Sequence, residues 1–108
     1  MKIFSSKRCW EYRFAGHPES PERVQKTYEY LVKNGFEITE PVECKESDIL
    51  LAHSKTLLDE VKSENFYEPD TPSIKGIYQY ALLSAGSAIL SANEAVKKNP
   101  SFSLMRPP

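Results

Sequence analysis

The sequence Ser101-Phe102-Ser103-Leu104-Met105-Arg106-Pro107-Pro108 does most to decide the expected fold of this chain. Its first residues predict a short, largely buried strand, and the two prolines after Arg106 predict a stiff turn because proline fixes φ. A long helical pattern comes directly before it, so the strand is expected to rejoin a sheet through a helical crossover, parallel to its neighbours. This stretch therefore indicates an α/β protein.

Residues 73–98, immediately before that strand, predict one long helix that Asn99-Pro100 ends. Leu83 and Leu90 fall on the side opposite its main apolar face, so both sides need cover, as in a helix between a sheet and other helices. Small side chains at 81 and 84–88 favour close approach by a neighbouring backbone. The main face is predicted to comprise Ile74, Ile77, Tyr78, Ala81, Leu82, Ala85, Ala88, Ile89, Ala92 and Val96.

The earlier part of the chain alternates strand and helix patterns. In order, we expect a strand at 2–5, a helix from Ser20-Pro21 to Asn34, a strand at 36–39, a helical turn at 47–52, a helix after Ser54 and a loop at 63–71. Together with the C-terminal strand, these predict a few-stranded, mostly parallel sheet. Since about three strands are few for this class, residues 1–108 are expected to form a single partial domain with an incomplete core.

Composition excludes several classes of partner. The 14 basic and 15 acidic residues are spread along the chain and give a formal net charge of −1, which predicts neither a nucleic-acid partner nor an anionic membrane surface. No apolar run has the length of a membrane span or of a secretory signal. Cys9 and Cys44 lie far apart, which favours reduced thiols in a cytoplasmic protein, although a disulfide between them stays open.

Four separated segments resemble, in the same order, the histone deacetylase and acetoin-utilisation family of zinc-dependent deacetylases. They are His17-Pro18-Glu19-Ser20-Pro21-Glu22-Arg23; Leu51-Ala52-His53-Ser54 with Leu57-Leu58; Asp70-Thr71-Pro72 with Tyr78-Gln79-Tyr80-Ala81 and Ala85-Gly86; and the C-terminal stretch. In the family, Arg-Pro-Pro continues into Gly-His-His, whose histidines lie beside the metal. The resemblance implies an N-terminal portion of an arginase/deacetylase-like layered fold that ends just before the His-His motif.

The resemblance also implies roles for three residues. Asp70 is similar to the rim aspartate that binds substrate backbone N–H groups, which suits an ionised acceptor. Arg23 resembles an arginine that reaches the channel behind the metal, and His17 is expected to form part of the wall of its entrance. Without the family, Asp70 would be interpreted as a turn former, Arg23 as a surface helix residue and His17 as a turn residue.

The groups that carry the family's chemistry are not expected within this sequence. Zinc polarises the amide carbonyl in the family, and its ligands come from an Asp-x-His motif and a later aspartate. There is no Asp-x-His here, so we expect no catalytic residue, no metal ligand and no cofactor in this chain, with zinc in full-length members. A zinc site built from Cys9, His17, Cys44 and His53 is disfavoured by their wide spacing.

The expected function is therefore that of an N-terminal fragment of a deacetylase-like zinc amidohydrolase, which cleaves acetyl-lysine or a related amide. Alone, it is expected to be inactive, and its expected partner is the missing C-terminal half. One alternative is a non-catalytic module that self-associates through an open sheet edge. Another is a small ligand-binding domain with a pocket near Phe66, Tyr67 and Asp70.

Overall fold

A three-stranded parallel sheet forms the centre of the protein, and a computed structural model describes residues 1–106 of the chain. The strands are β1 (Lys2–Phe4), β2 (Ile38–Thr39) and β3 (Ser101–Ser103), in the order β2-β1-β3. Ile3 pairs with Ile38 on one side and Phe102 on the other. The predicted α/β class and parallel sheet are thus confirmed, whereas the predicted Pro107-Pro108 turn lies outside the described residues.

The helices that connect the strands are α1 (Glu22–Lys33), α2 (Glu46–Ile49), α3 (Lys55–Lys62) and α4 (Ile77–Val96). A short 3₁₀ helix, η1 (Lys7–Trp10), follows β1 in a segment that the sequence left irregular. Ser54 caps α3 as predicted, since its hydroxyl accepts from the Leu57 N–H at 3.2 Å. Within residues 1–106, no helix is both long and apolar enough to cross a bilayer.

The long helix is shorter than predicted. It begins at Ile77, not at 73, and it ends at Val96, not at 98. Gly76 has φ +84° and Lys98 has φ +64°, and a residue in this left-handed region cannot continue a right-handed helix. The predicted strand at 36–39 is likewise reduced to Ile38–Thr39, because the Phe36 N–H still bonds to the Leu31 carbonyl at the end of α1.

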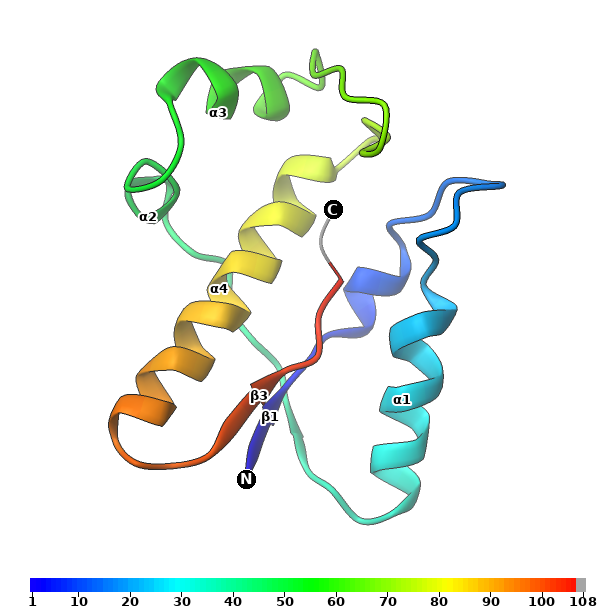
Figure 1. Cartoon of the computed structure of the whole chain (residues 1–108), viewed down its shortest axis with the longest axis vertical. Coiled ribbons are helices and arrows are strands. Elements are labelled where there is room, and N and C mark those ends of the chain that lie inside the picture. The colour runs from blue at the N-terminus through cyan, green and yellow to red at the C-terminus, as the bar shows by residue number, and fades with distance from the viewer. Residues whose placement is uncertain (107–108) are drawn as a thin grey trace.

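The sheet lies between two helices. Figure 1 shows α4 on one side of β1 and β3 and α1 on the other. Side chains alternate along β3, so Ser101 and Ser103 face α4, where their hydroxyls bond to Ser91 at 3.0 Å and Ser87 at 2.8 Å. Phe102 therefore points to the opposite face, and its side chain remains 51% exposed. No residue of α1 is fully buried, so α1 covers this face only in part.

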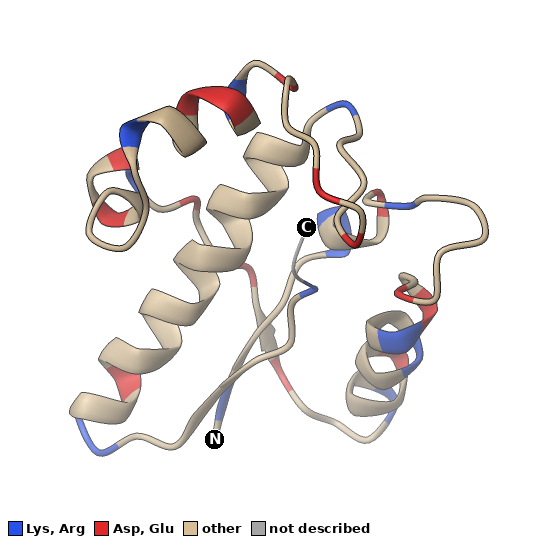
Figure 2. Ribbon diagram, turned by 45° about the horizontal axis from the view of Figure 1, so that its top comes forward, with Lys and Arg blue, Asp and Glu red and all other residues tan. Residues whose placement is uncertain are grey.

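The buried side of α4 differs from the predicted apolar face. Leu83, Gly86 and Ser87 are buried together with Ile77 and Leu82, whereas Ile89 and Val96 are exposed. The Cys44 N–H donates to the Leu82 carbonyl at 3.0 Å, so the backbone of residues 42–44 lies directly against α4. The close backbone approach predicted for the run at 84–88 is confirmed at Gly86, where an added Cβ would meet the backbone of residues 42–44, whereas Ser84, Ala85 and Ala88 line a cavity on the other side of the helix. Figure 2 shows that α4 is almost free of charged residues.

Candidate functional site

A cavity with a partly polar lining lies where three distant segments meet. It measures about 160 Å³ and is lined by Tyr12, Phe14, His17, Glu19, Asp70, Thr71, Pro72 and Arg106. We call it the rim pocket. The segment after η1 forms one wall, the loop before α4 forms a second wall, and Arg106, three residues beyond the end of β3, contributes the guanidinium. The fold thus brings the predicted residues His17 and Asp70 to one cavity.

Arg106 is the most highly coordinated side chain at the rim pocket, and only 3% of it is exposed. Its Nε donates to both carboxylate oxygens of Glu19, at 2.9 and 3.1 Å, and its Nη2 also donates to Glu19. Its Nη1 donates to the backbone carbonyls of Cys9, at 3.0 Å, and Tyr12. A forked guanidinium suits this task because it binds a carboxylate and two carbonyls at once.

Tyr12 lies beside Arg106 and is also buried. Its ring centre is 5.2 Å from the guanidinium carbon, and its hydroxyl donates to the Pro72 carbonyl at 3.0 Å. Burial raises the pKa of Tyr12 above its usual value, and the Arg106 charge opposes that rise. The hydroxyl therefore stays protonated, and remains a donor, at neutral pH.

His17 occupies a tight turn in front of the helix α1. The backbone N–H of His17 donates to the Phe14 carbonyl at 3.2 Å, and the ring nitrogen Nδ1 accepts from the backbone N–H of Glu19 at 3.2 Å. Since Nδ1 is an acceptor, the neutral ring carries its proton on Nε2. The ring is held in place at the pocket wall by this bond, while its predicted part in a substrate entrance stays a prediction.

Asp70 lies exposed at the outer edge of the rim pocket. Its own N–H donates to Glu68 Oε2 at 2.9 Å, and within residues 1–106 its carboxylate accepts no hydrogen bond. The carboxylate oxygens are thus free to accept from a bound molecule. Its predicted role in binding substrate is compatible with this position and stays a prediction.

Arg23 does not line the rim pocket. Its side chain is 69% exposed on α1, and its Nη1 lies 3.8 Å from Glu19 Oε1. The carboxylate that it approaches is the one that Arg106 binds with much shorter contacts. Residues 1–106 form no cavity that Arg23 lines among those described here, so its predicted role in a channel stays a prediction.

Metal-binding side chains do not gather in the described part of the chain. Among residues 1–106, no three His, Cys, Asp or Glu side chains lie close enough together to hold an ion. Cys9 is buried, and burial raises the pKa of its thiol above the usual value, with the Arg106 charge acting in the opposite direction. These residues do not fit a zinc ion, and we assign none of them a step that depends on one.

A second cavity, of about 460 Å³, lies between α2, α3 and α4. It is lined mostly by aliphatic side chains, among them Leu57, Leu58 and Ala85, with His53 and Tyr78 at its wall. His53 is exposed where it lines this cavity, between α2 and α3. This cavity offers few polar groups and no convergent set that would bind a polar substrate.

Sequence reasoning assigned no site role to several members of the rim pocket, among them Tyr12, Glu19 and Arg106. Glu19 stands inside the quoted His17-Pro18-Glu19 segment and Arg106 inside the C-terminal one, so both motifs were visible. Their pairing was not, because the two residues are 87 positions apart. Tyr12 belongs to no motif, and a single sequence holds no signal for it.

Comparisons with known proteins agree with one another. Residues 17–108 match the Histone deacetylase domain family. A protein of Archaeoglobus fulgidus described as "Probable deacetylase" is 32% identical over 104 residues, which cover 85% of this chain and 29% of that protein. The crystal structure of the HDA15 HD domain superimposes with a TM-score of 0.84 at 20% identity, over 100% of this chain and 36% of that one.

The structural match confirms an arginase/deacetylase-like fold. The fold is partial, since the chain spans about a third of the length of the proteins that it matches. The solved structure supports the fold alone, whereas the match to the domain family extends over most of the sequence, from His17 onwards. By that match, the chain belongs to the histone deacetylase family.

Proposed function

We propose that this chain forms the N-terminal part of a zinc-dependent deacetylase domain and supplies one wall of its substrate entrance. The observation that carries the proposal is the rim pocket, which gathers His17, Asp70 and Arg106 from three segments that resemble the family. The name of the Archaeoglobus fulgidus relative, "Probable deacetylase", supports the same class of reaction, hydrolysis of an amide.

In this proposal, the described residues bind and orient substrate. Asp70 offers two carboxylate oxygens, which accept no hydrogen bond from residues 1–106, to the backbone N–H groups of an acetyl-lysine peptide, and an ionised acceptor binds such donors strongly. Zinc would polarise the amide carbonyl in the complete domain, with ligands that these residues do not supply. Arg106, in contrast, holds the backbone at the point from which the family pattern continues toward the metal.

The proposal also concerns partner and compartment. The chain by itself is proposed to be inactive and to need the remainder of the domain as its partner, because it spans only about a third of its relatives. Both cysteines are free thiols, which supports a reducing, cytoplasmic setting.

A chimaeric protein tests this function. Residues 1–108 replace the matched segment of the Archaeoglobus fulgidus relative, and hydrolysis of an acetyl-lysine peptide is measured with and without a zinc chelator. We expect chelator-sensitive hydrolysis by the chimaera and none by this chain alone. The relative without its matched segment is the control and should also be inactive.

Two results would contradict the proposal. One is a chimaera that folds cooperatively but does not hydrolyse the peptide. The other is hydrolysis by residues 1–108 alone, which would mean that the reacting groups lie within them.

A second candidate function is a non-catalytic module that self-associates. The observation that favours it is the free edge of β3, the last strand in the order β2-β1-β3, with the exposed Phe102 beside it. Unpaired backbone groups on an edge strand invite another strand.

A further inference from the structure

The loop that carries Asp70 is held in shape mainly by its own residues. Residues 63–76 connect α3 to α4, and the Thr71 N–H donates to the Glu68 carbonyl at 3.2 Å. The Gly76 N–H donates to Glu64 Oε1 at 2.8 Å. Such bonds fix the local turns of the loop, but they do not fix its position against the opposite wall of the rim pocket.

One hydrogen bond does fix that position. The Tyr12 hydroxyl donates to the Pro72 carbonyl, two residues after Asp70. Within residues 1–106, it is the only hydrogen bond that joins the loop 63–76 to the N-terminal segment 1–20. Tyr12 is only 6% exposed, so water competes poorly for this bond.

Tyr12 is itself held rigidly. Its carbonyl accepts from Arg106, its ring lies under the guanidinium, and its ring packs edge-on against Tyr80 with centroids 6.1 Å apart. Arg106 is in turn fixed by both oxygens of Glu19. These contacts fix the position of the Tyr12 hydroxyl. A side chain can orient a neighbouring segment only if its own position is fixed in this way.

We propose that Tyr12 is the positioning residue for Asp70: its hydroxyl holds the Asp70 loop at the rim pocket, and the Glu19–Arg106 pair holds Tyr12. The claim about substrate binding rests on the proposed function, because it takes Asp70 as the group that contacts substrate. The claim that Tyr12 holds the loop does not depend on that function.

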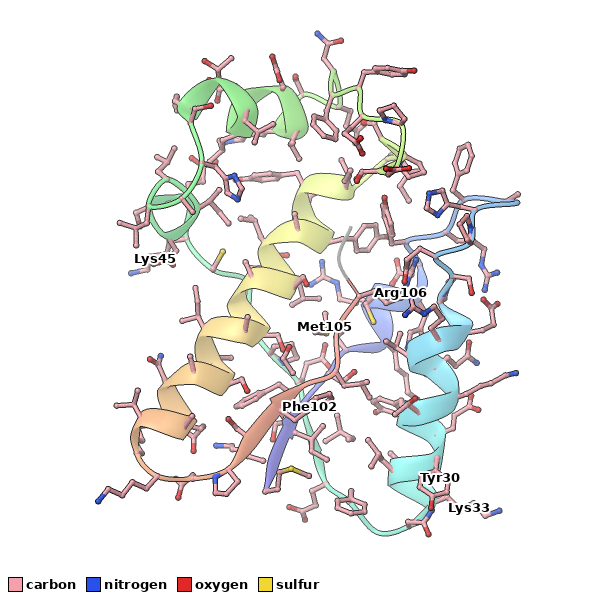
Figure 3. The ribbon with its side chains drawn as sticks, in the orientation of Figure 1. Tyr30, Lys33, Lys45, Phe102, Met105 and Arg106 are labelled. Carbon is pink, nitrogen blue, oxygen red and sulfur yellow. The ribbon has the colours of Figure 1, made fainter. Side chains whose placement is uncertain are left out.

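The first test uses this chain alone and the variant Tyr12→Phe, which keeps the ring and removes the donor. We expect the amides of Asp70 and Thr71 to exchange with solvent roughly two to ten times faster, as the loss of one hydrogen bond implies. Tyr30→Phe is the control, since Tyr30 is 66% exposed near the far end of α1 (Figure 3), and should change neither rate. Unchanged rates in Tyr12→Phe, or equal acceleration throughout the chain, would overturn the inference.

The second test uses the chimaera and separates positioning from general stability. We expect Tyr12→Phe to raise KM for the peptide roughly two- to tenfold with little change in kcat, since a binding contact is displaced. Asp70→Asn should raise KM as well, and the double variant should be no worse than Asp70→Asn. Fully additive effects on KM would mean that Tyr12 does not act through Asp70.

The two tests fail independently. A folded but inactive chimaera counts against the deacetylase function, while the exchange rates of Asp70 and Thr71 still decide whether Tyr12 holds the loop. If the chimaera is active and Tyr12→Phe does not change its KM, the positioning role is overturned and the proposed function is unaffected.

Discussion

At the scale of single residues, Arg106 shows how a buried charge becomes tolerable. A guanidinium taken out of water is costly unless its charge is paired and its donors find acceptors, and Glu19, Cys9 and Tyr12 supply acceptors to all three nitrogens of Arg106. Removal of Glu19 would leave a buried charge unpaired, which in general costs about 3–5 kcal/mol. The pair therefore links the start of α1 to the exit of β3 and defines the back of the rim pocket.

Tyr78 gives a prediction at the same scale. It donates a hydrogen bond to the Glu46 carboxylate, which also binds Lys62, and this bond, more than burial or charge, raises the pKa of Tyr78 to about 12. An unfolded chain loses this proton near the ordinary tyrosine pKa of 10.0, so the folded state should lose stability as pH rises from about 10 to about 12. Below pH 10 the contribution is fully present.

The pKa of Tyr78 can be measured from the ultraviolet absorbance of tyrosinate as a function of pH. Subtraction of the curve of Tyr78→Phe from that of the wild-type chain isolates the contribution of Tyr78. The difference curve should have its midpoint well above that of free tyrosine. Glu46→Gln is the matched control, since it removes the charged acceptor and should move the midpoint down. A midpoint that Glu46→Gln leaves unchanged would argue against this cause.

At the scale of elements, α4 is defined by its contact with the backbone of residues 42–44. A Cβ on Gly86 would lie 2.8 Å from the Cys44 nitrogen and closer still to the Val42 carbonyl oxygen. Backbone atoms at that position cannot rotate away as a side chain can. Only glycine fits at position 86 without a clash, despite its poor helix propensity.

The substitution Gly86→Ala tests this contact. Helix propensity alone would stabilise the protein by about 1 kcal/mol, but the clash should reverse the sign and lower the free energy of unfolding by roughly 1–3 kcal/mol. Ser84, two residues earlier on the same helix, lies at the wall of the larger cavity. The control substitution Ser84→Ala should therefore not lower the free energy of unfolding. Urea unfolding of both variants gives the comparison, and a stabilised Gly86→Ala would contradict the close packing.

At the scale of the whole molecule, the protein is thin, with extents of 41 × 34 × 16 Å. The sheet is only three strands wide, and one of its faces is covered only in part by α1. Phe102 lies on that face, at the free edge formed by β3 (Figure 3). A surface of this kind is expected to be covered, either by the rest of the domain or by a second copy.

We therefore expect the isolated chain to associate as its concentration rises. Phe102→Lys should reduce that association, because a charge on an edge strand opposes pairing. Val96→Lys is the matched control, since Val96 is also exposed, at 83%, but is the last residue of α4 and belongs to no strand. Sedimentation measures the outcome, and a compact wild-type monomer at high concentration would contradict the expectation.

The sequence by itself determined the class and order of the elements, because hydrophobic period and chain-breaking residues are local signals. Two positions show this: Ser54 caps α3 as predicted, and a neighbouring backbone lies close to α4 at Gly86, within the small-residue run. Local signals also carried the family motifs at His17, Asp70 and Arg106.

Only the tertiary structure decided which faces are buried and which motif residues meet. The sheet-facing side of α4 centres on Gly86 and Ser87 rather than on the most apolar face, because close backbone approach outweighs side-chain hydrophobicity there. The bonds from Arg106 to Glu19, and from Tyr12 to Pro72, join segments 87 and 60 positions apart. Such pairings arise from the crossing of strands and loops in space, and no local period of the sequence encodes them.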